Sequence, residues 1–82
     1  MEESELEFAI SMMVRDANIF SRYAERARAK NLSTLEQDYS SRLLGIDRAM
    51  THLGWKLEDD GRRTDCKDSE HIEYRHYRAI ER

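Results

Sequence analysis

The residues of this chain that could bind a metal are one cysteine and three histidines. Cys66, His71 and His76 follow one another at five-residue intervals, and His52 could supply a fourth ligand. Zinc prefers sulfur and imidazole ligands, but five residues rotate a helix by roughly 140° and place alternate side chains on opposite faces of a strand. We therefore expect no metal site, and no other cofactor is implied.

Catalytic residues are not expected either. The loop around Cys66 is too polar to enclose a substrate, and the serines lack the glycine-flanked turn of a nucleophile elbow. The glycines do not form a phosphate-binding loop. We predict that the chain is not an enzyme and binds no small-molecule substrate.

Arginines interleaved with tyrosines could hold single-stranded nucleic acid by charge and stacking. The net charge of −3 and neighbouring acidic residues disfavour this interpretation, which remains the alternative function. The candidate nucleic-acid residues are Arg22, Arg26, Arg28, Tyr74, Arg75, Tyr77 and Arg78.

The elements that must position these residues are predicted to be mainly helical. The chain has 82 residues, no proline and three glycines, which disfavours a turn-rich all-β fold. Apolar residues recur at three- and four-residue intervals over 6–27 and again over 39–57, as in two amphipathic helices. Partners across an antiparallel pair would have residue numbers that add up to 63, such as Met13 with Met50 and Ala24 with Tyr39.

Residues 1–57 are thus expected to form a long antiparallel αα-hairpin. Asn31 suits the left-handed position after the first helix, and Ser33 with Glu36 resembles a capping box for the second. Gly54 is a natural helix stop. Gly45 in mid-helix predicts close packing against a neighbour, with a hinge as the alternative.

The rest of the chain completes a single domain. Residues 58–71 carry nine charges and predict an acidic loop, and residues 72–82 form a short C-terminal element that packs on the hairpin. Helix is favoured over strand for that element, because a strand would find a partner only in residues 55–57.

Some apolar residues of the hairpin lie off the seam between its helices. A two-helix hairpin buries one face of each helix, so these residues need a cover, either the C-terminal element or another chain. We predict a small protein–protein interaction or scaffolding module that self-associates, with a dimer favoured. The interface candidates are Phe8, Met12, Ile19, Tyr23, Leu44 and Trp55.

The expected location is the cytoplasm. A single cysteine suits a reducing compartment, and no apolar run approaches the roughly 20 residues that span a bilayer. The acidic residues at 2, 3 and 5 are unlike the basic start of a secretory signal. Neither a membrane nor a small molecule is therefore expected as a partner.

Overall fold

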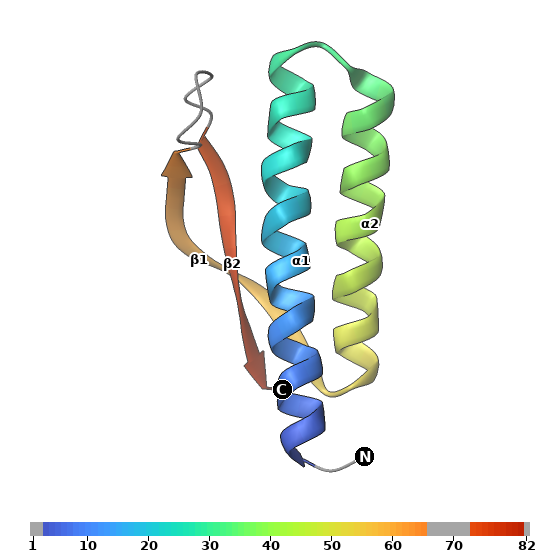
Figure 1. The fold of residues 1–82 in the computed structure, drawn as a ribbon, viewed down its shortest axis with the longest axis vertical. Helices are drawn as coiled ribbons and strands as arrows, with labels where there is room; N and C mark the ends of the chain where they lie inside the picture. Colours follow the sequence, from blue (N-terminus) through green and yellow to red (C-terminus); the bar gives the residue numbers. More distant parts are fainter. Residues whose placement is uncertain (1–2, 66–72, 82) are drawn as a thin grey trace.

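Two helices and a two-stranded sheet make up the fold in a computed structural model, which describes residues 3–65 and 73–81. The order is α1 (Glu3–Ala29), α2 (Ser33–His52), β1 (Trp55–Asp65) and β2 (Glu73–Glu81). In Figure 1, α1 lies between the sheet and α2. The predicted antiparallel helical hairpin and the mainly helical content are confirmed.

The core lies along α1 and consists mostly of alanines, with Ile10 and Met50 as its larger members. Ile10, Ala17 and Ala24 of the predicted stripe are buried, together with Ala27 and, on α2, Met50. Alanines let neighbouring elements approach α1 closely. Larger rings flank this core: the Phe20 and Tyr39 ring centroids lie 6.1 Å apart.

The helix connection has the hydrogen bonds of a Schellman turn. Asn31 has a φ of 59°, as predicted, and the Leu32 N–H donates to the Ala27 carbonyl at 2.8 Å. The capping box is wrong, because α2 begins at Ser33 itself and the N-cap is Leu32, which has no side-chain cap bond. The Glu36 carboxylate accepts a hydrogen bond from Arg28 Nε at 2.8 Å instead.

The prediction of a helical C-terminal element is wrong, because residues 73–81 form a strand. Helix α2 ends at His52, and Gly54 turns the chain with a φ of 84°, which leaves residues 55–57 to begin β1. Trp55 pairs with Glu81 and Leu57 with Ala79 in antiparallel register. The partner of residues 73–81 is therefore β1, which is longer than the three residues 55–57 that the sequence suggested.

The prediction of an acidic loop is wrong for residues 58–65. Residues 58–65 belong to β1, and the remainder of the predicted loop lies outside the described residues. Charges are accommodated because they pair across strands, as Arg78 Nη2 does with Glu58 Oε2 at 2.8 Å. The register shifts between Asp59 and Arg63, where Gly61 has a φ of 87° and β1 forms a bulge opposite His76.

Polar side chains of α1 form hydrogen bonds with backbone groups of Tyr77 and Arg75 in β2. The Tyr77 N–H donates to Asn18 Oδ1 at 2.7 Å, and Asn18 Nδ2 donates to the Tyr77 carbonyl at 3.2 Å. Ser21, only 5% exposed, donates from Oγ to the Arg75 carbonyl at 2.7 Å. These three bonds dock the sheet on the helix.

The close packing predicted at Gly45 is wrong. Gly45 is exposed, and a Cβ atom at this position would meet nothing within 4 Å. The residue therefore lowers helix propensity without a packing gain.

Replacing Asn18 with alanine should lower the free energy of unfolding by about 1–3 kcal/mol. The substitution leaves the part-buried Tyr77 N–H and carbonyl without their partners. Chemical denaturation monitored by circular dichroism measures the effect, with the exposed Gln37→Ala on α2 as control. Equal stability of N18A and the control would contradict the docking role.

Gly45→Ala should raise the free energy of unfolding by about 1 kcal/mol, since alanine is the better helix former and has open space there. Gly54→Ala is the matched opposite, because its φ of 84° should cost alanine about 1 kcal/mol or more. Thermal denaturation of both variants checks the signs. A destabilised G45A would show that the position contacts something after all.

Candidate interaction surface

Helix α1 has an exposed apolar stripe formed by Phe8, Met12, Ile19 and Tyr23, here called the α1 stripe. Phe8 is 67% exposed, Ile19 37% and Tyr23 38%, whereas Met12 is half-buried. Their spacing of four, seven and four residues keeps them on one side of the helix. Four of the six predicted interface residues therefore share one face.

The α1 stripe is uncovered because both neighbours of α1 occupy its other sides. At 100° per residue, the stripe lies roughly 140° around the helix from Asn18 and Ser21, which bind β2. On the α2 side, Tyr23 is the boundary residue: its ring centroid lies 5.4 Å from that of Tyr39. The stripe thus faces away from the sheet and borders α2.

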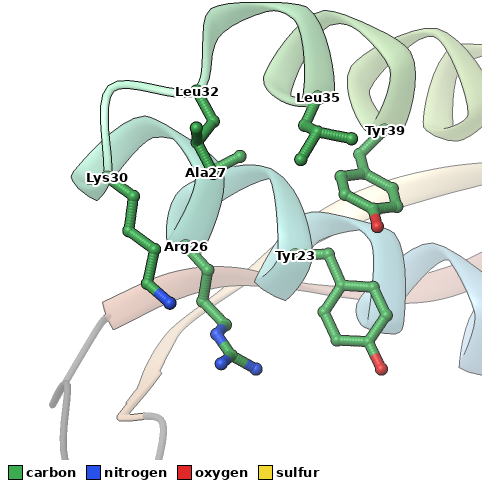
Figure 2. Close-up of a pocket in the computed structure, with 7 residues that line it drawn as sticks. All are labelled: Tyr23, Arg26, Ala27, Lys30, Leu32, Leu35 and Tyr39. Carbon is green, nitrogen blue, oxygen red and sulfur yellow. The ribbon is translucent and has the colours of Figure 1, made fainter.

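A groove adjoins the α1 stripe at the end of the helical hairpin. It has a volume of about 390 Å³, and we call it the end groove. Figure 2 shows the Tyr23, Arg26 and Lys30 side chains extending in the same direction from the end of α1. The lining residues are Tyr23, Arg26, Ala27, Lys30, Leu32, Leu35 and Tyr39. Leu32 and Leu35 are 44% and 45% exposed, so the end groove continues the apolar surface beyond Tyr23.

Leu44 and Trp55 do not join this surface. Leu44, 49% exposed, lines a hollow with Leu57 and Tyr77 between α2 and the sheet. Trp55 is half-buried in β1 and lines a different hollow with Ile10 and other residues of α1 and β2. Helical periodicity could not place Trp55, because the residue belongs to a strand.

Four of the seven candidate nucleic-acid residues, Arg28, Tyr74, Arg75 and Tyr77, line one hollow between the sheet and the helices, but several of the candidate arginines pair with carboxylates. Arg28 contacts both Glu25 and Glu36 at 3.1 and 2.8 Å. Arg75 Nε lies 3.2 Å from Asp59, and Arg78 pairs with Glu58. These ion pairs neutralise cations that would otherwise attract phosphate.

The remaining candidates of that group have structural neighbours. Tyr74 and Tyr77 are half-buried, and both line a hollow between the sheet and the helices. Arg22 is half-buried on α1, and Arg26 lines the end groove. The two tyrosine rings are only partly exposed, which limits the surface that they offer for stacking on a base.

The bulge in β1 contains a polar cluster that sequence reasoning missed. Asp60, whose side chain is 7% exposed, accepts hydrogen bonds from the Arg62 N–H at 2.8 Å and from Arg62 Nε at 2.9 Å. His76 Nδ1 lies 2.7 Å from the same carboxylate. The Arg62 side chain foremost, with the Arg62 N–H and His76, holds the pKa of Asp60 far below its usual range.

Asp59 is the second carboxylate of the cluster. Asp59 accepts hydrogen bonds from Arg63 at 2.9 and 3.0 Å and from the Gly61 N–H at 2.9 Å, and Arg63, followed by that N–H, lowers its pKa. Asp59 and Asp60 are thus both acceptors for backbone groups within the bulge. We assign the cluster a structural role: it fixes the local turn of β1.

The described residues offer neither a metal centre nor a membrane span. Within 3–65 and 73–81, no three His, Cys, Asp or Glu side chains gather closely enough to hold a metal ion. Cys66 and His71 of the predicted series lie outside this part of the chain. The same residues include no helix with the length and hydrophobicity to cross a bilayer.

Asp60 should make stability fall in acid. Its folded-state pKa is depressed, so its contribution is complete above the unfolded value of about 4 and is lost as the pH falls below that value. Asp60→Asn should be less stable than the wild type at pH 7 and should lose less stability between pH 4 and pH 2. Urea unfolding across this range measures both slopes.

The control for this titration is Asp38→Asn, which removes an exposed carboxylate paired with Arg42. D38N should be about as stable as the wild type at pH 7, because an exposed ion pair contributes little to the free energy of unfolding. An unchanged slope in D60N would contradict the assigned role of the bulge cluster.

Comparisons with known proteins do not assign the chain to a family. No family model matches it, and the searches of curated proteins and of solved structures find no match either. The function is therefore argued from the α1 stripe, the end groove and the ion pairs described above.

Proposed function

We propose that this chain is a small non-enzymatic interaction module that self-associates through the α1 stripe. The observation that carries the proposal is the exposure of Phe8, Ile19 and Tyr23 on a helix whose other sides are packed against α2 and β2. Aromatic residues and methionine, both present in the stripe, are enriched in the centres of protein interfaces. The single cysteine suits a cytoplasmic setting for such a module.

Burial of the α1 stripe would stabilise a complex appreciably. Removing a large apolar side chain from water contributes about 1.5–3 kcal/mol when the side chain starts fully exposed. Phe8, at 67% exposure, offers more than half of that gain, and in a symmetric dimer each contribution occurs twice. The buried apolar residues of the single chain are few and mostly alanines. Association through the α1 stripe would therefore also add to the free energy of unfolding of the chain.

Nucleic-acid binding is less well supported. The pairing of Arg28, Arg75 and Arg78 with carboxylates removes much of the positive potential that phosphate binding needs. Salt-dependent retention on heparin, with no self-association, would favour that alternative over the interaction module.

Sedimentation velocity over a micromolar to millimolar concentration series tests the proposal. We expect the wild type to form dimers and Phe8→Glu to weaken dimerisation at least tenfold, because a charge would replace a buried ring. Leu44→Glu is the matched control. It likewise replaces an exposed large apolar side chain with glutamate, but Leu44 lies in the hollow beside the sheet and not on the α1 stripe.

Two results would contradict the proposal. A wild-type chain that stays monomeric throughout the series would exclude self-association. Equal loss of dimer in F8E and L44E would move the interface away from the α1 stripe. Circular dichroism of both variants confirms that each is folded before comparison.

A further inference from the structure

We infer that the partner of the α1 stripe is a second copy of this chain, docked with its α1 antiparallel so that facing residue numbers add up to 31. The inference rests on the proposed function and gives it a register. Phe8 then faces Tyr23 of the partner subunit, and Met12 faces the partner's Ile19. The centre of the interface lies between Arg15 and Asp16.

The pattern of the helix itself has this symmetry. A twofold dimer requires that if one residue contacts a second, the second contacts the first in return. The symmetry point lies between Arg15 and Asp16. When the chain direction is reversed about this point, Phe8 takes the position of Tyr23 and Met12 takes the position of Ile19. The apolar surface is therefore complementary to itself in one antiparallel register.

The charges that border the α1 stripe have the same symmetry with opposite signs. Glu5, exposed on the first turns, would face Arg26 of the partner subunit. Arg15 would face the partner's Asp16. Within one chain, the side chains of Arg15 and Asp16 are 63% and 48% exposed, and Arg15 Nε lies 3.9 Å from Asp16 Oδ1. A parallel arrangement would place Glu5 against Glu5 and Arg26 against Arg26, so repulsion disfavours it.

The end groove fits the residue that this register delivers. Phe8 has the most exposed large apolar side chain among the described residues, and its ring would arrive beside Tyr23 at the mouth of the end groove. Figure 2 shows Arg26 and Lys30 extending on the Tyr23 side of this groove, where Glu5 of the partner subunit would come near them. In the antiparallel register, the Phe8 ring therefore meets the apolar end groove of the partner subunit, and Glu5 lies near Arg26 of the partner subunit.

Disulfide cross-linking tests the register directly. In a Cys66→Ser background, Phe8→Cys and Tyr23→Cys chains are prepared separately and mixed under mild oxidation. We expect a cross-linked dimer in the mixture of F8C and Y23C and much less in either variant alone. Efficient linkage in F8C alone and in Y23C alone, with no mixed F8C–Y23C dimer in the mixture, would indicate a parallel pair and overturn the inference.

A charge exchange tests the ion pairs independently. Glu5→Arg and Arg26→Glu should each weaken dimerisation about tenfold, since each replaces two attractions per dimer with two repulsions. The double variant E5R/R26E should return to within about threefold of the wild type. The control is Glu7→Arg, which changes an exposed charge on the same helix but on the side toward β2.

Failure of the antiparallel register and failure of self-association give different results. If the double variant is no better than the single ones while the wild type dimerises through Phe8, the register is wrong and the proposed function stands. If sedimentation shows only monomers and no mixture cross-links, both are wrong. Dimerisation that persists unchanged in every charge variant would also overturn the antiparallel register.

Discussion

The edge of β2 that faces away from β1 is the constraint on which the rest of this structure depends. A two-stranded sheet is marginal in water, and an unpaired edge presents backbone donors and acceptors that need partners. Asn18 binds both backbone groups of Tyr77, and Ser21 binds the Arg75 carbonyl. Helix α1 thereby supplies partners for the backbone groups of Tyr77 and Arg75 in the middle of β2.

This arrangement determines which part of α1 remains available. The helix contacts β2 on one side and α2 on another, so only its third side is left to solvent, and that side contains the α1 stripe. The bulge cluster around Asp60 supports the arrangement from the sheet, because it fixes β1 opposite His76. Docking the sheet and exposing the stripe are thus two consequences of the same packing of α1.

The helical hairpin could be predicted because its signals are local: apolar periodicity, the left-handed Asn31 and the stop at Gly54. The strands could not be predicted in the same way. Residues 58–65 contain no large apolar side chain; they pair with β2 through cross-strand charges, and β2 in turn is bound by Asn18, which is distant in sequence. Phe8, Ile19 and Tyr23 were found as an exposed group from spacing alone, whereas Leu44 and Trp55 needed the position of the sheet.

We propose that α1 binds a second copy of itself through the side that carries the α1 stripe. The most direct measurement is isotope-filtered nuclear Overhauser spectroscopy on an equal mixture of labelled and unlabelled chains. The antiparallel α1 pair should give intermolecular contacts between the rings of Phe8 and Tyr23 and none from Leu44. Intermolecular contacts confined to Leu44 and the sheet, or their complete absence at millimolar concentration, would contradict it.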